Sequence, residues 1–107
     1  MFCNGVGATL VALFASYTAA PPQWIICVGG FFPRSEEIRN RIVYCKQSLH
    51  VMGRNDDLVP MANSLELRNS MNGKSDTFTH DGGHMIPLNS SGRSFLLDWI
   101  VSANLIV

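Results

Sequence analysis

The chain has 107 residues, enough for one small domain with a single core and too short for two. Hydrophobic residues make up 47% of it and charged residues only 15%, a composition that excludes the class of disordered proteins. Its formal net charge is zero, and no basic run resembles a stripe that binds nucleic acid. We therefore expect a globular domain with no nucleic-acid partner.

The first long apolar stretch, residues 6–20, is the one segment with some likeness to a targeting sequence. No positive charge precedes it, and polar residues and glycines interrupt its start. A signal peptide requires a basic n-region, and a membrane span requires about 18 unbroken apolar residues. The pattern instead predicts a buried helix over residues 8–17, ended by Pro21-Pro22, and no membrane partner.

The chain contains three cysteines, Cys3, Cys27 and Cys45, an odd number without a CxxC pair. Such spacing is typical of reduced thiols and not of a disulfide framework. The sequence therefore predicts a cytoplasmic protein.

Strands and helices alternate through the rest of the chain. Residues 24–28 form a continuous apolar run, typical of a strand covered on both faces in a parallel sheet. Two further strands are predicted at residues 48–52 and 76–80. The predicted helices are a short helix or turn at 35–40, a helix at 61–71 and a helix from about 92 to 105. This order predicts an α/β fold with about three parallel strands and flanking helices.

Two polar loops follow the second and third predicted strands. Asp56 lies just after the strand that ends at residue 52, and His84 follows the strand that ends at residue 80, behind Gly82-Gly83. Because the carboxyl ends of parallel strands meet at one edge of a sheet, we expect Asp56 and His84 to be neighbours there. An acid that orients an imidazole in this way makes the histidine a candidate general base.

These two segments carry a resemblance to a known family. Residues 48–60 (SLHVMGRNDDLVP) resemble the Gly-x-x-Asp-x-x-Val-Pro segment that carries the acid in α/β-hydrolases. Residues 80–87 (HDGGHMIP) look like the His-x-Gly-Gly-His-x-x-Pro signature of the FSH family of serine hydrolases, and VGGFFPR at residues 28–34 resembles a further strand end of that family. The resemblance implies the catalytic acid Asp56, in preference to Asp57, the base His84, and a structural role for His80.

The nucleophile of that family sits in a Gly-x-Ser-x-Gly turn, and the match to it is incomplete. In one alignment Cys3-Asn4-Gly5 takes the Ser-x-Gly place, so that Cys3 is the nucleophile. In the other, Gly5-Val6-Gly7 takes it, which suits the following helix better and leaves a glycine at the nucleophile position. Both alignments remain open from the sequence.

The resemblance implies a truncated domain: residues 1–107 correspond to the C-terminal half of an α/β-hydrolase, without its N-terminal strands. The implied activity is hydrolysis of small acyl esters or thioesters, weak or absent in this chain. The alternative is a non-catalytic interaction module that self-associates through an exposed sheet edge. No metal or cofactor is expected, because His50, His80 and His84 lack a zinc-like ligand set.

Overall fold

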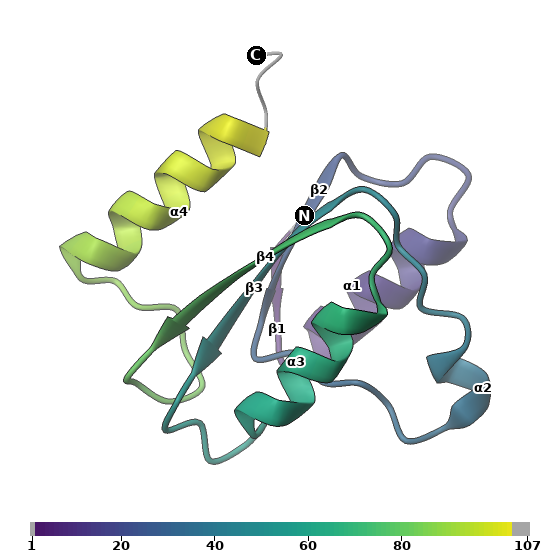
Figure 1. Ribbon diagram of the computed structural model, residues 1–107, viewed down its shortest axis with the longest axis horizontal. Helices are drawn as coiled ribbons and strands as arrows, with labels where there is room; N and C mark the ends of the chain where they lie inside the picture. The colour runs from purple at the N-terminus through teal and green to yellow at the C-terminus, as the bar shows by residue number, and fades with distance from the viewer. Residues whose placement is uncertain (1, 104–107) are drawn as a thin grey trace.

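A computed structural model describes residues 2–103, with side chains from residue 4 onward, as a parallel sheet with helices on both faces (Figure 1). The strands lie side by side in chain order, and each pairs in parallel with the next. They are β1 (Phe2–Asn4), β2 (Trp24–Val28), β3 (Gln47–Gly53) and β4 (Lys74–His80). The predicted α/β class with parallel strands is confirmed.

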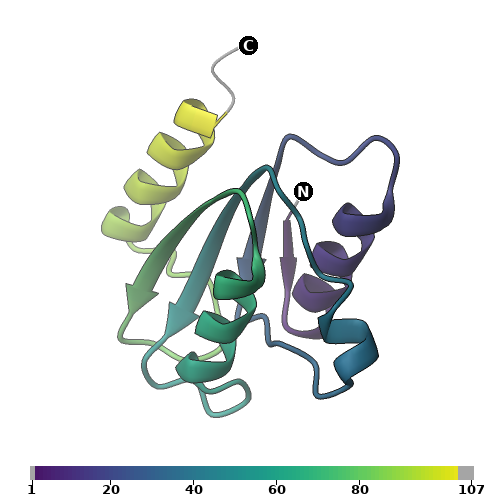
Figure 2. The same cartoon turned by 45° about the vertical axis from the view of Figure 1, so that its right-hand side comes forward.

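The helices form two layers around this sheet. Helices α1 and α3 cover one face, with the short α2 beside them, and α4 covers the opposite face (Figure 2). Their bounds are α1 (Val6–Tyr17), α2 (Glu36–Arg39), α3 (Met61–Ser70) and α4 (Ser90–Ala103). None of the helices in this described part of the chain is both long and apolar enough to cross a membrane.

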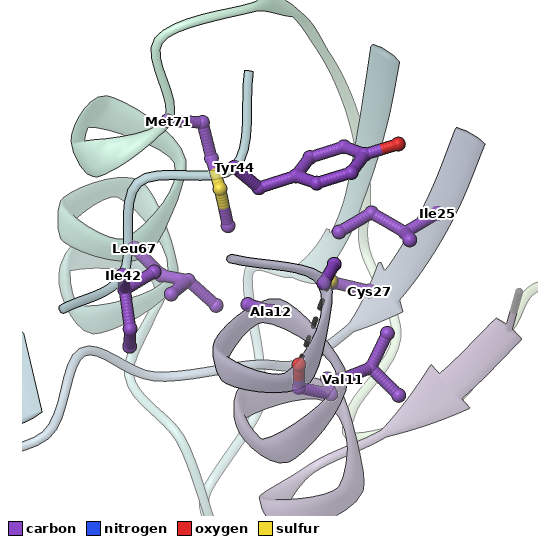
Figure 3. Close-up of a cluster of buried hydrophobic side chains, with 10 residues drawn as sticks. Val11, Ala12, Ile25, Cys27, Ile42, Tyr44, Leu67 and Met71 are labelled. Atoms are coloured by element: carbon purple, nitrogen blue, oxygen red, sulfur yellow. Dashed lines mark hydrogen bonds between the residues drawn. The ribbon is translucent and has the colours of Figure 1, made fainter. Parts of the chain in front are cut away.

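Strand β2 contributes side chains to a core on each face of the sheet. Ile25 and Cys27 point toward α1 and α3, whereas Ile26 and Val28 point toward α4. This follows from the period of two along a strand, and it explains why residues 24–28 are apolar without alternation. Figure 3 shows the first of these cores, to which β2 contributes Ile25 and Cys27 and α3 contributes Leu67.

The second core packs the aromatic face of the last helix against the sheet. Trp99 of α4 is 7% exposed and packs with Leu49 and Val51 of β3. Its indole N–H donates to Asp76 Oδ2 over 2.9 Å, which satisfies the polar atom of a buried ring. Helix α4 is thereby fixed to β4, the strand that leads into the His84 loop.

The structure differs from the predicted elements mainly at the N-terminal end. Strand β1 was not predicted, because three residues ending in a polar asparagine are too short to show a strand pattern. Helix α1 begins at Val6, two residues before the predicted start, so that Gly5 alone joins β1 to α1. This direct strand-to-helix turn lies at the same end of the sheet as the loops that follow β3 and β4 (Figure 2).

Candidate active site

Asp56 and His84 meet at the carboxyl edge of the sheet. His84 Nδ1 lies 2.7 Å from Asp56 Oδ2, and the two side chains are 18% and 1% exposed. A carboxylate only accepts hydrogen bonds, so Nδ1 carries a proton, and in the neutral form of the ring Nε2 keeps a lone pair. This pair, which we call the dyad, therefore has a free basic nitrogen of fixed orientation.

The carboxylate of Asp56 is held from both sides. Its Oδ1 accepts hydrogen bonds from the backbone N–H groups of Leu58 and Val59, each over 2.8 Å, while Oδ2 faces His84. Burial alone would raise the pKa of Asp56, but the N–H donors and His84 outweigh it and hold this pKa below its usual value. Asp56 thus stays ionised beside the ring, whereas the adjacent Asp57 is exposed.

The two loops that carry the dyad are joined by their backbones. Arg54 N–H donates to His80 O over 2.8 Å, and Asn55 N–H donates to Gly82 O over 3.1 Å. Gly53 allows this approach, because a Cβ atom there would lie 2.4 Å from the carbonyl oxygen of Gly82. The distance between Asp56 and His84 is therefore set by main-chain contacts as well as by their own bond.

His80 belongs to the turn and makes no contact within the dyad. Its Nδ1 accepts a hydrogen bond from Gly82 N–H over 3.1 Å, consistent with the structural role expected for it. A surface cavity of about 620 Å³ adjoins this turn, and its lining includes neither Asp56 nor His84. The cavity walls include Arg54, Phe78, His80, Met85 and Leu88.

Gly29 is a member of the site that the sequence reading did not identify. It follows β2 with φ +58°, and a Cβ atom there would lie 2.5 Å and 2.6 Å from two ring atoms of His84. The same atom would lie 3.2 Å from Asp56 Oδ2. Gly29 therefore forms the surface on which the imidazole lies, and both its conformation and its lack of a side chain are required. The sequence signals at this position were the Gly29-Gly30 pair at a strand end and the family resemblance of residues 28–34.

Gly5 is the second glycine that faces His84. It has φ 56° and ψ −124°, a combination that strains any residue with a side chain, and a Cβ atom there would lie 3.0 Å from His84 Nε2. Gly5 and Gly29 are the two residues with positive φ in the described chain. We call the turn from β1 to α1 at Gly5 the elbow, and it is the backbone element that stands opposite the basic nitrogen of the dyad.

Cys3 lies within β1, where its backbone pairs with Cys27 of β2. Its side chain is outside the described part of the structure, so the nucleophile role considered for it stays a prediction. The geometry around Gly5 supports the alignment in which Gly5-Val6-Gly7 takes the Ser-x-Gly place. A metal site has no support from geometry either, because the described residues hold no group of three or more potential metal ligands.

Comparison with known proteins relates this chain to hydrolases. A model of the family described as serine hydrolase (FSH1) matches residues 4–96. The chain is similar to the human (Homo sapiens) protein Esterase OVCA2, with 33% identity over 103 residues, which cover 88% of this chain and 45% of that protein. The chain therefore spans about half the length of this curated relative.

Solved structures show the same relation at the level of the fold. The esterase PE8 superposes with a TM-score of 0.71 and 19% identity, over 95% of this chain and 48% of that one. MGS-M1, an alpha/beta hydrolase from a deep-sea metagenome library of the Medee basin, gives a TM-score of 0.63 at 15% identity, over 95% and 52%. The fold is thus that of part of an α/β-hydrolase.

Proposed function

Because the chain belongs to the serine hydrolase (FSH1) family, we propose that its dyad is the base of a site that hydrolyses carboxylic ester or thioester bonds. The observation that carries this proposal is the 2.7 Å bond between His84 and a buried, ionised Asp56, with His84 Nε2 directed at the elbow. In this arrangement His84 would move the proton of the attacking group, and Asp56 would orient and stabilise the ring.

For this chain by itself we propose weak or absent activity. In the nucleophile-His-Asp scheme the elbow residue attacks the acyl carbon and forms a covalent intermediate. Gly5 has no side chain with which to do so. The first N–H groups of α1 would supply a donor for a developing oxyanion, and a site that lacks one such donor reacts roughly 10²–10³ more slowly.

The test is hydrolysis of p-nitrophenyl butyrate by the purified chain beside His84→Ala and Cys3→Ala. We expect slow release of p-nitrophenol that disappears in His84→Ala and persists in Cys3→Ala. Loss of activity in both variants would identify Cys3 as the nucleophile instead. A rate that His84→Ala leaves unchanged would contradict the proposal that the dyad is the base.

A second candidate function is a non-catalytic interaction module, and one observation favours it. Helix α1 exposes an apolar row at helical spacing, made of Val6, Leu10, Phe14 and Tyr17, each more than half exposed. Within the described sheet, β1 also forms an edge next to this helix. This candidate predicts self-association that Leu10→Glu abolishes, measured by light scattering over a range of concentrations. A monodisperse monomer at every concentration would count against it.

We also propose that the protein is located in the cytoplasm. Its support is the odd number of cysteines without a paired motif, typical of thiols kept reduced. Fractionation of cells that carry a tagged chain would test the location. Recovery from a secretory or membrane fraction would contradict it.

A further inference from the structure

The cavity beside the His80 turn has the size of a small-molecule site. Its volume is about 620 Å³, and such sites occupy roughly 300–1,000 Å³. It lies where β4 ends, and residues of the loop that joins β4 to α4 (Figure 1) form most of its lining. We call it the loop cavity. Asp56 and His84 do not line it, so its occupant need not be a substrate of the dyad.

Apolar side chains form much of the wall of the loop cavity. Phe78 is held in place by Phe95 of α4, with ring centroids 4.5 Å apart. Met85 is 50% exposed and Leu88 is 68% exposed, and both border the same hollow. Exposed apolar side chains gathered at a concave surface are typical of a binding site. Because the unbranched side chain of Met85 adapts to different shapes, the wall favours a flexible aliphatic chain.

The charged groups of the loop cavity balance each other. Arg54 Nη1 donates to Asp81 Oδ1 over 2.7 Å, and Arg54 Nη2 donates to Thr79 Oγ1 over 3.1 Å. Arg54 and Asp81 are the only Arg, Lys, Asp or Glu residues in the lining, so the wall has no net charge to attract an ion. A guanidinium has five N–H donors, and these two bonds use two of them. The cavity thus combines an apolar wall with a fixed hydrogen-bond donor and no excess charge.

We propose that the loop cavity binds a small uncharged aliphatic molecule, a chain with a hydroxyl or carbonyl oxygen at one end. The chain lies against Phe78, Met85 and Leu88, and its oxygen accepts a hydrogen bond from Arg54. This site is separate from the dyad, and the proposal does not depend on the role of His84 as a base.

The first experiment titrates the unaltered chain with 1-butanol, 1-hexanol and 1-octanol, and with sodium octanoate as the charged counterpart of octanol. The methyl signal of Met85 and the ring C–H signals of His80 report binding by NMR. We expect saturable shifts at both residues, with a dissociation constant that falls by up to about tenfold for each two added methylene groups. Octanoate should bind more weakly than octanol, because no excess positive charge offsets the desolvation of its carboxylate.

His50 and helix α1 are the internal controls of this titration. His50 is 1% exposed and does not line the cavity, so its ring signals should not move. Leu10 and Phe14 belong to the exposed apolar row of α1, the other surface to which an alcohol can bind. Shifts confined to α1, or shifts at His80 and Met85 that do not depend on chain length, would overturn the proposal. Tighter binding of octanoate than of octanol would overturn the assignment of an uncharged ligand.

The second experiment compares Leu88→Glu with Leu97→Glu. The two leucines are similarly exposed, 68% and 63%, but Leu88 lines the loop cavity and Leu97 of α4 does not. Leu88→Glu should weaken octanol binding by at least about tenfold, because it places a carboxylate beside the aliphatic chain. Leu97→Glu should leave the affinity unchanged. Equal affinities in the two variants would contradict the proposed site.

The binding experiments and the hydrolysis test fail independently. If octanol does not bind while the unaltered chain shows His84-dependent ester hydrolysis, the loop-cavity proposal fails and the proposed function stands. If octanol binds as expected and no hydrolysis depends on His84, the proposed function fails and the loop-cavity proposal stands. If Leu88→Glu does not fold, the alcohol series with the unaltered chain decides the proposal alone.

Discussion

The two halves of the candidate site are built in different ways. The dyad depends on specific side chains: Asp56 is buried, accepts two backbone N–H bonds and holds the ring of His84. The elbow depends on backbone alone, with Gly5 bound to β2 on one side and to α1 on the other. The proposed base therefore has both of its side chains in place, whereas the elbow at Gly5 offers a defined backbone position without a side chain.

This difference shows that the geometry of the turn at Gly5 does not depend on a side chain at that position. The sheet fixes where β1 ends, and the first turn of α1 fixes the direction of the chain after it. The dyad has no such independence, because the position of His84 depends on Gly29 and on the contacts between the two loops. Substitutions in the dyad should therefore have larger effects than substitutions that only fill the elbow.

The largest effect is expected from Asp56→Asn in the Gly5→Ser background. An amide cannot hold Nδ1–H in the same way or stabilise the charged ring, so ester hydrolysis should fall by about 10³–10⁴-fold. Steady-state kinetics with p-nitrophenyl butyrate would measure the fall. Asp57→Asn is the matched control, because Asp57 is the exposed neighbour on the same loop. Equal losses in the two variants would mean that Asp56 has no special role.

The next largest effect is expected from Gly29→Ala, which should disrupt the hydrogen bond between Asp56 and His84 without changing either residue. A Cβ atom would lie 2.5 Å from the ring of His84, and the positive φ of +58° adds strain. We expect a loss of about 3 kcal/mol in the free energy of unfolding, from strain of 1–2 kcal/mol and a displaced ring. Urea unfolding would measure this loss, and the proton resonance of His84 Nδ1–H would report the broken bond.

Gly30→Ala is the control for that variant. A Cβ atom at Gly30 would lie 2.7 Å from Leu67 Cδ2 and would not reach His84. We expect it to destabilise the fold through packing and to leave the His84 resonance in place. Retention of that resonance in Gly29→Ala as well would contradict the role given to Gly29.

The smallest effect is expected from the protonation of His50, a histidine of β3 that, unlike His84, lies outside the dyad. His50 is 1% exposed, and burial, with the nearby charge of Arg68, lowers its pKa from 6.5 to about 4. The folded chain thus keeps His50 neutral in a range where the unfolded chain binds a proton. Acidification from pH 7 to pH 4.5 should therefore lower the free energy of unfolding by about 2 kcal/mol through this group.

Urea unfolding at the two pH values, for the native chain and for His50→Leu, would measure that contribution. The variant should lose about 2 kcal/mol less on acidification, because its position 50 does not titrate. Equal losses in the two chains would show that His50 does not carry the effect.

Much of the fold can be predicted from the sequence because its signals are local. The apolar run of β2 and the proline before α3 each identify an element by themselves. Strand β1 cannot be identified in this way, because it is a strand only through pairing with β2, with Asn4 opposite Val28. The same pairing decides that Gly5 and not Cys3 stands at the turn, which is why spacing alone leaves both alignments open.

The residues of the candidate site also divide into those with a local sequence signal and those whose role depends on distant parts of the chain. Asp56 and His84 each follow a strand that the sequence indicates, so their common edge can be predicted. The role of Gly29 cannot be predicted, because it depends on contact with the imidazole of His84, which is distant in the sequence, and on the space left by the missing side chain. No local pattern distinguishes such a glycine from an ordinary one at a strand end.

The conformation of Gly5 also bears on the balance between stability and activity in this fold. A serine held at φ 56° and ψ −124° would store roughly 1–3 kcal/mol of strain, which the rest of the domain would have to offset. Glycine avoids that strain. However, glycine loses more conformational freedom on folding, which lowers the free energy of unfolding by about 0.5–1 kcal/mol. Glycine at position 5 should therefore make the folded state more stable than serine would, by roughly 0–2.5 kcal/mol.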